Sequence, residues 1–368
     1  MYFFVPKDFG LEEKYNKGFK VDELFKVCLL GPNSHRDDFA ISFTYEEAVA
    51  KLSDFNNKAI SDDKVVEKYH LKETGEWNVH DAREQVSGDD VPVQCLYRVF
   101  DDRYMLYYSY IFDRPRHNLN THLLKSNLGL IVNRQSRLLF SPFVTNKPLG
   151  QHCILDPREG SYATPLYLYF DNLGEEERIV NFNKDIYDSI AKGLNYLPCY
   201  DDNVLVDPTS EYNGVLYPQD LFDYIYAVLH SPSYRERYKE FLKIDFPRIP
   251  YPTDWEKFRD LAEKGEELRQ LHLMEDLPHS TGVSFPIGGT LQVDCYRWEQ
   301  NRVYINSEQY FEGVPESAWN FYIGGYQPAQ KWLKDRKDMT LSFEDVKHYQ
   351  QIIYVLQQTE RLMNEIDE

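Results

Sequence analysis

The hydrophobic period changes along this chain, and that change constrains the fold more than any other feature. Short runs rich in β-branched and aromatic residues occupy residues 95–170, as expected for strands. Between residues 218 and 275, apolar side chains recur at helical spacing instead, beginning at Leu221. Strand-type runs return at 290–311. A β-rich core with an intervening helical layer predicts an α+β fold.

The β-rich stretch and the helical layer can each be divided further. Six runs are predicted as strands of one sheet, covering residues 95–100, 103–112, 128–133, 138–144, 152–155 and 163–170. The helical layer is predicted to hold three helices. Ser231-Pro232 separates the first two, and Thr253 with Glu256 forms a capping-box pattern at the start of the third.

The two ends of the chain have different patterns. Near the N-terminus, helices are predicted over residues 21–30 and 44–55, and the polar stretch 61–90 is interpreted as a connector. Ser342 is predicted to cap a last helix, in which apolar residues keep near-heptad spacing. A helix with so narrow an apolar stripe packs on a partner helix, in the same chain or in another.

These patterns predict three regions. They are an N-terminal mixed α/β segment (1–94), a central region (95–340) and a C-terminal spacer or docking helix (341–368). The central region contains β-rich parts at 95–170 and 290–311 and the helical layer at 218–275.

Composition and cysteine usage indicate an intracellular globular protein. The chain has 368 residues, 42% of them hydrophobic, which is enough to bury a sizeable core. The five cysteines are far apart without any Cys-x-x-Cys pair, so neither a disulfide framework nor a zinc site is predicted. The sequence shows neither a signal-peptide pattern nor an apolar run long enough to span a membrane. We therefore expect a cytoplasmic protein without membrane contact.

A local reversal of charge is the best clue to function. Nine basic residues against four acidic ones lie between Tyr97 and Arg158 in a chain whose net charge is -19. Lys and Arg neutralise phosphates, and Arg, Asn and Gln read base edges in the major groove of DNA. This basic window is therefore a candidate DNA-binding surface. The alternative is that its arginines are solvated strand residues or ion-pair partners for the surrounding carboxylates.

Individual residues differ in how well they suit DNA contact. Arg98 and Arg103 flank Asp101-Asp102, so internal bracing is as good an interpretation as phosphate contact. Arg114 and Arg116 lie beside Pro115 in a predicted loop and are better phosphate candidates. Asn133, Arg134 and Gln135 offer three base-reading side chains in succession. Alternation along a strand would point Asn133 and Gln135 one way and Arg134 the other. The full set of predicted DNA contacts is Arg114, Arg116, Asn133, Arg134, Gln135, Arg137, Arg302, Tyr304, Asn306 and Gln309.

Several kinds of chemistry lack their residue patterns here. The sequence contains no Pro-Pro pair, which excludes the Asn-Pro-Pro-Tyr type of loop that grips a flipped adenine. It also contains no Gly-x-Gly cofactor loop and no nucleophile signature. We therefore predict no catalytic residue, no metal site and no cofactor in this chain.

Four blocks of the sequence resemble one family. They are Tyr97-Arg98-Val99-Phe100-Asp101-Asp102-Arg103-Tyr104 followed by Tyr107-Tyr108, residues 221–232, residues 243–250, and Gly324-Gly325-Tyr326 with residues 332–336. They are similar to the C-terminal specificity region of Type ISP and Type IIG restriction-modification enzymes, although Val99 stands where a proline is usual. The resemblance runs from about residue 25 to the end of the chain.

The resemblance implies a target-recognition domain that binds double-stranded DNA and presents an adenine to a methyltransferase. That methyltransferase would lie upstream, outside this chain, and would use S-adenosylmethionine. Two other hypotheses stay open. The chain could be a protein-interaction module whose tyrosines and terminal helix bind a partner subunit, or a free-standing enzyme of unfamiliar chemistry.

Overall fold

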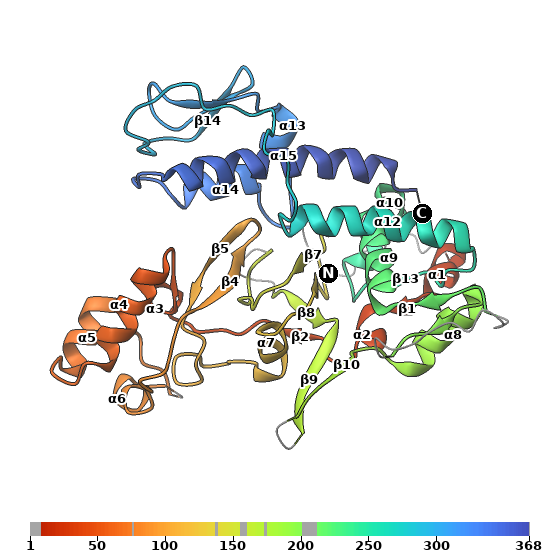
Figure 1. Cartoon of the computed structure of the whole chain (residues 1–368), viewed down its shortest axis with the longest axis horizontal. Coiled ribbons are helices and arrows are strands. Elements are labelled where there is room, and N and C mark those ends of the chain that lie inside the picture. Colours follow the sequence, from red (N-terminus) through yellow and green to blue (C-terminus); the bar gives the residue numbers. More distant parts are fainter. Residues whose placement is uncertain are drawn as a thin grey trace.

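The computed structural model describes residues 9–75, 77–136, 139–154, 160–172, 175–200 and 212–367. It is a mixture of helices and antiparallel sheets, which confirms the predicted α+β class. Figure 1 shows a small lobe of helices at one end, sheets at the centre, and a layer that includes the long C-terminal helix along one side.

The strands predicted as one sheet belong to three sheets, two larger ones and a hairpin that pairs residues 167–172 with 175–180, so the single-sheet prediction is wrong. The first sheet has the order β2 (Leu29–Leu30), β8 (Tyr162–Pro165), β6 (Gly129–Val132) and β7 (Phe143–Thr145). The second has the order β3 (Ile41–Ser42), β5 (Asp101–Met105) and β4 (Val93–Arg98). Each of these two larger sheets takes an edge strand of two residues from the N-terminal segment. Such short strands leave no periodic signal, so only long-range pairing reveals them.

Further strand pairs complete the sheet content. They are the hairpin β9 (Tyr167–Asn172) with β10 (Glu175–Val180), the pairs β1 (Phe19–Lys20) with β13 (Arg248–Ile249) and β11 (Leu197–Pro198) with β12 (Val215–Leu216), and the sheet β14 (Arg297–Glu299), β15 (Arg302–Tyr304) and β16 (Tyr310–Glu312). The predicted late strands are therefore shorter than expected. The predicted strand at 152–155 is wrong for residues 152–154, which form turns and bends, while Leu155 lies outside the described residues.

The N-terminal segment holds more helix than its sequence pattern indicates. Thr44 caps α4 (Tyr45–Asn56) by accepting a 3.1 Å hydrogen bond from the Glu47 amide, which confirms the predicted helix. The predicted connector contains α5 (Asp62–Tyr69) and α6 (Val79–Arg83), so that prediction is wrong. The predicted helix over 21–30 is also wrong. Only α2 (Val21–Leu24) forms, because the chain then extends to bridge Phe25 with Phe182.

The helical layer forms at the predicted place, but the second predicted helix is divided in two, and one cap is shifted. It contains α9 (Pro218–His230), α10 (Pro232–Arg237), α11 (Lys239–Leu242) and α12 (Trp255–His272). Asp254 caps α12 by accepting from the Lys257 amide at 2.9 Å, so the predicted cap at Thr253 is wrong by one residue. The other helices are α1 (Phe9–Asn16), α3 (Asp37–Ala40), α7 (His117–Leu123), α8 (Lys184–Leu194), α13 (Glu316–Asn320) and α14 (Pro328–Lys334).

The last helix, α15 (Phe343–Glu365), is the longest in the described chain. Ser342 caps it by accepting from the Asp345 amide at 3.0 Å, as predicted. Its partners lie in the same chain. It packs on α12, α13 and α14, and the ring of Tyr349 lies 4.4 Å from that of Phe311 in the β14–β16 sheet. Figure 1 shows α15 between this sheet and α12.

Two clusters of buried side chains form the interior. The smaller cluster draws on residues 39–112 and the larger one on residues from 15 to 366. Strand β4 contributes to both, because Cys95 packs into the small core and Leu96 into the large one. The predicted region boundary at residue 94 therefore falls within a strand shared by the two cores.

Candidate nucleic-acid interface

Most cations of the basic window have partners within the protein. Four of them face carboxylates: Arg103 with Asp101, Lys125 with Glu176, Arg134 with Asp245, and Lys147 with Asp102. Arg98 lies 4.1 Å from the ring of its neighbour Tyr97 and donates to the Tyr97 carbonyl. Arg137 and Arg158 lie outside the described residues. The ion-pair interpretation of the window therefore holds for these four residues.

Arg103 has a structural role. Its guanidinium donates to Asp101 Oδ2 at 2.8 and 3.1 Å, and Arg336 of the segment after α14 donates to Asp101 Oδ1 at 2.8 Å. Burial tends to raise the pKa of Asp101, but the two guanidinium groups prevail and hold that pKa below its usual range. The three side chains brace the β4–β5 hairpin against the C-terminal part of the chain.

Arg114 and Arg116 are exposed, as predicted, on the loop that precedes α7. The loop backbone is fixed, because Arg114 pairs with Asn33 and Tyr107 Oη donates to the Pro115 carbonyl at 2.5 Å. In the described part of the chain no carboxylate lies within ion-pair distance of either guanidinium. Two free cations on a rigid loop are suited to contact successive phosphates.

The turn after β6 differs from the prediction for Asn133, Arg134 and Gln135. The strand ends at Val132 and the chain bends, so the expected alternation is wrong: Asn133 is buried and its two neighbours are both exposed. Gln135 donates to the Ile244 carbonyl at 3.1 Å. Asn133 is 1% exposed and its amide has no hydrogen-bond partner among the described residues. In this structure Asn133 cannot reach a base.

Four predicted DNA contacts lie on or beside the β14–β16 sheet, and two of them are buried inside the protein. Arg302 is partly exposed but donates twice to Glu312, and Tyr304 packs at 5.1 Å on Tyr310. Asn306 and Gln309 are buried, which contradicts their prediction as base-reading side chains.

These two amides hold the loop at residues 287–292. Gln309 accepts from the Leu291 amide at 2.9 Å and donates to the Ile287 carbonyl at 3.1 Å. Asn306 donates to the Gln292 carbonyl at 3.0 Å and accepts from the Gln309 amide. Because both ends of each amide are in use, neither can hydrogen-bond to a base without breaking the loop.

The candidates do not form one contiguous site. In Figure 1 the β14–β16 sheet and helix α7 lie on opposite sides of the molecule. Arg114 and Arg116 therefore belong to a different face from Arg302 and Tyr304.

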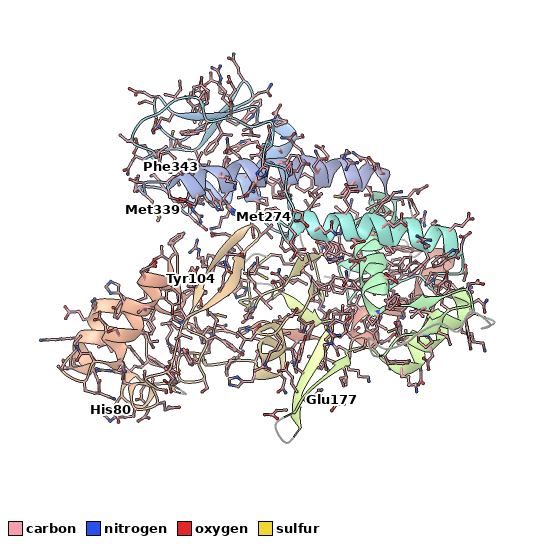
Figure 2. All side chains as sticks on the ribbon, in the orientation of Figure 1. His80, Tyr104, Glu177, Met274, Met339 and Phe343 are labelled. Carbon is pink, nitrogen blue, oxygen red and sulfur yellow. The ribbon has the colours of Figure 1, made fainter. Side chains whose placement is uncertain are left out.

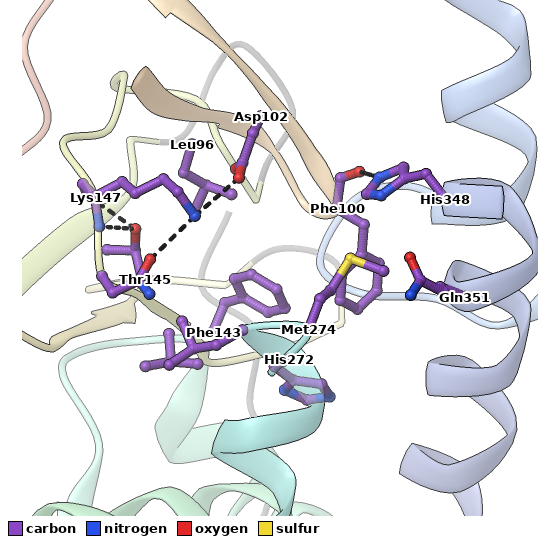
Figure 3. A pocket seen from close by; sticks show the side chains of 13 residues that line it. Leu96, Phe100, Asp102, Phe143, Thr145, Lys147, His272, Met274, His348 and Gln351 are labelled. Carbon is purple, nitrogen blue, oxygen red and sulfur yellow. Dashed lines mark hydrogen bonds and ion pairs between the residues drawn. The ribbon is translucent and has the colours of Figure 1, made fainter. Parts of the chain in front are cut away.

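A central pocket lies where the sheets meet the helices, and the sequence pattern did not reveal it. Its volume is 250 Å³, and it is lined by residues of β4, β5 and β7, the end of α12, and α15. Figure 3 shows Phe100, Phe143 and Met274 as its apolar wall. Lys147 Nζ lies 2.9 Å from Asp102 Oδ2 and 3.1 Å from Asn146 Oδ1. An aromatic wall beside a few polar groups suits a small planar ligand.

His272, on the floor of this pocket, is held in one orientation (Figure 3). Its Nδ1 lies 2.5 Å from Tyr226 Oη and its Nε2 lies 2.9 Å from Thr359 Oγ1. Burial lowers the pKa of His272 to about 3. The ring is therefore neutral at physiological pH and serves as a structural hydrogen-bonding group rather than a proton-transfer group.

The described residues contain no cluster of His, Cys, Asp and Glu that could hold a metal ion. In the same part of the chain no helix combines the length and the apolar character required to cross a bilayer.

Comparison with solved structures shows that this fold is similar to part of several larger proteins. The ATP-dependent Type ISP restriction-modification enzyme LlaBIII bound to DNA is 19% identical, with a TM-score of 0.72 over 96% of this chain and 24% of its own. A nuclease-deletion mutant of the Type ISP enzyme LlaGI with a DNA substrate mimic is 19% identical, with a TM-score of 0.68 over 96% of this chain and 34% of its own. The DrdV–DNA complex is 19% identical, with a TM-score of 0.70 over 93% of this chain and 36% of its own.

The present chain thus spans between about a quarter and a third of the length of these structures. A search of curated proteins found no match. The model of the Type ISP C-terminal specificity domain matches residues 23–365, nearly the whole chain. The chain therefore belongs to the family of Type ISP C-terminal specificity domains.

Proposed function

We propose that this chain binds duplex DNA and recognises its sequence on behalf of a restriction-modification enzyme. The family match over residues 23–365 carries the proposal. The three similar structures are DNA complexes, which supports it. Within this chain, the exposed pair Arg114 and Arg116 supplies uncompensated positive charge on a rigid loop, and Arg134 and Gln135 are exposed on the turn after β6.

The enzyme we propose modifies adenine. An upstream methyltransferase part would bind S-adenosylmethionine and transfer its methyl group, while this chain positions the DNA. The sequence has no Gly-x-Gly loop between a strand and a helix, so the residues present do not fit that cofactor. A cytoplasmic location follows from the proposal, because the DNA substrate lies there.

A second candidate function is protein docking through the start of α15. Phe343 is 81% exposed, and Met339 lies near it at the same end of the helix (Figure 2). An exposed aromatic of this kind suits contact with another protein surface. Docking of the methyltransferase here is compatible with DNA recognition elsewhere in the chain.

Salt-dependent binding tests the proposal. We would measure the fluorescence anisotropy of labelled duplex DNA pools with this chain, with and without the methyltransferase part, from 50 to 200 mM salt. Replacing Arg114 and Arg116 with Gln should lower the slope of log K against log salt by about 1.8, because each phosphate contact contributes about 0.9.

The matched control replaces Lys192 and Lys257, two exposed lysines on α8 and α12, with Gln. It removes the same charge and should leave the slope unchanged if binding is local to the loop. Equal effects of the two double variants would show that net charge alone is acting. Absence of DNA binding under every condition would leave the docking function as the better explanation.

A further inference from the structure

We propose that a pocket between the turn after β6 and the helices α10–α11 binds a phosphate group. The cavity has a volume of 220 Å³. One side is formed by Arg235, Lys239 and Lys243 together with the carboxylate of Glu236, and the other by Ser136 and Ser141. Three cations facing two hydroxyl groups form a donor set suited to an anion.

Arg235 is the central observation. Its Nε donates to the Leu229 carbonyl at 2.6 Å, which fixes the guanidinium in place. No carboxylate of the described chain lies within ion-pair distance of it. Burial lowers its pKa to about 10, so it keeps its charge at neutral pH. Cations that are largely withdrawn from solvent are normally paired, and Arg235, which is intermediate in exposure, has no such counter-charge among the described residues.

The groups that face Arg235 from the interior do not supply that charge. They are Tyr226, His230 and His272, and burial keeps all three neutral at physiological pH. The pKa values of both histidines are lowered, first by burial and then by the nearby guanidinium. Among the described residues that line the pocket, Glu236 is the one carboxylate, but its side chain is 80% exposed and pairs with Lys239 rather than with Arg235. A bound anion would therefore supply the counter-charge that Arg235 lacks.

Ser136 provides an independent observation on the opposite wall. Its side chain is 1% exposed and its hydroxyl has no hydrogen-bond partner among the described residues. Buried polar groups without a partner are rare in folded proteins. The hydroxyl lines the cavity, where it can donate to an oxygen of a bound anion.

The remaining charges favour an anion as well. Lys239 lies 3.5 Å from Glu236, and Lys243 lies 2.6 Å from Glu240. These pairs are exposed, and such pairs contribute little, so both ammonium groups can turn toward a ligand. Phe140, Leu242 and Tyr322 form an apolar border of the pocket.

A phosphate group fits this donor set through its several acceptor oxygens. Two sources share that chemistry: the backbone of DNA and a free phosphate. Binding of a phosphate of the DNA backbone rests on the proposed function, whereas binding of a free phosphate does not.

Two measurements on the 368-residue chain test the pocket. Inorganic phosphate is titrated by calorimetry at constant ionic strength, and the salt slope for duplex DNA is measured by anisotropy. The variants are Arg235→Gln, the double variant Lys239→Gln with Lys243→Gln, and Ser136→Ala. Arg259→Gln, on the exposed face of α12, is the control. The lysine double variant changes only exposed side chains, so it tests the pocket even if Arg235→Gln does not fold.

We expect phosphate affinity to fall about tenfold in Arg235→Gln and severalfold in the lysine and serine variants, with the control unchanged. If the lysine variant also lowers the DNA salt slope by about 0.9 for each lysine that contacts a phosphate, the source is the DNA backbone. If the slope is unchanged, the ligand is a free phosphate.

Phosphate binding by a chain that does not bind DNA would contradict the proposed function and leave the pocket intact. Phosphate affinity that is absent in the unmodified chain, or equal in all variants, would overturn the inference.

Discussion

Arg336 donates to Asp101 through a 2.8 Å hydrogen bond that joins positions 235 residues apart in the sequence. Because Arg103 binds the other oxygen of the same carboxylate, one buried anion holds two buried cations. The β4–β5 hairpin and the segment after α14 are thereby fixed to each other. This contact lies inside two sequence blocks that resemble the family, which gives those blocks a structural explanation.

Replacing Asp101 with Asn should destabilise the protein by about 3–5 kcal/mol, because two buried guanidinium groups would lose their counter-charge. Urea unfolding measures this loss. The neighbouring variant Asp102→Asn is the control, since its ion pair with Lys147 is partly exposed and should contribute only about 0–1 kcal/mol. Similar losses in the two variants would contradict the bracing role of Asp101.

Replacing Gln309 with Ala should lower stability without changing DNA sequence preference. The amide holds the 287–292 loop, and removing it leaves partly buried backbone groups without these partners, at a cost of about 1 kcal/mol. Thermal unfolding and selection from a DNA pool measure the two properties. An altered recognition sequence in a variant of normal stability would restore Gln309 as a base-reading residue.

Gly265 marks the closest approach of α12 to α9. A Cβ atom at this position would lie 1.9 Å from the Asp223 carbonyl oxygen, so Gly265→Ala must push the helices apart. We expect a loss of about 1–3 kcal/mol, although helix propensity alone favours alanine by about 1 kcal/mol.

The matched control for this contact is Gly193→Ala in α8. Its nearest neighbour would be the Pro252 carbonyl oxygen at 3.5 Å, an ordinary contact distance. This variant should be neutral or slightly stabilising. Denaturant unfolding of both variants measures the difference, and a stable Gly265→Ala protein would disprove the close contact.

The buried His272 predicts a loss of stability in acid. Its folded-state pKa of about 3 lies below its unfolded value, so the unfolded state binds more protons between about pH 6.5 and 3. The contribution of His272 to the free energy of unfolding is fully present above about pH 6.5. It falls by about 2 kcal/mol when the pH is lowered to 5. The expected sign is therefore a decrease as pH falls.

The variant His272→Gln isolates that contribution. The free energy of unfolding is measured for both proteins at pH 7.5 and at pH 5. Between these two values the unmodified protein should lose about 2 kcal/mol more than the variant, because the contributions of other titrating groups cancel in the comparison. Asp223, whose pKa burial raises to about 7 despite its pairing with Arg269, is among the groups that cancel. An unchanged pH dependence would mean that His272 takes up its proton in the folded state.

Sequence patterns predicted the elements that have strong local signals. Thr44 and Ser342 begin their helices because each side chain accepts from a backbone amide three residues on, a local interaction that the sequence contains. The short strands at residues 29–30 and 41–42 were missed because only pairing with distant strands forms them. Elements that depend on local interactions were thus predicted correctly, and elements that depend on distant strand pairing were not.

The candidate site was predictable only in part. Arg114 and Arg116 were correctly predicted to lie in a loop, and both side chains are exposed there, whereas their contact with phosphate stays a prediction. The burial of Asn306 and Gln309 was not expected, since residue type does not show whether an amide faces a base or a backbone group. Their spacing of three residues, typical of a side-chain-supported turn, was the available signal.

The pocket at Arg235 was missed for a related reason. The helical pattern in α10 and α11 was defined by apolar residues such as Tyr234 and Leu242, and Arg235 stood in it as an ordinary polar position. Only the fold shows that no carboxylate of the described chain lies within ion-pair distance of it.

Strand β4 makes the small lobe and the central pocket parts of one mechanical unit. Cys95 is packed in the lobe, while the next residue, Leu96, forms part of the pocket wall. A side chain that enlarges or shrinks the lobe interior at Cys95 must displace the backbone that carries Leu96. Replacing the lobe with that of a related protein would therefore also change the shape of the pocket. Dividing the chain at residue 94 would break a strand on which both the lobe and the pocket depend.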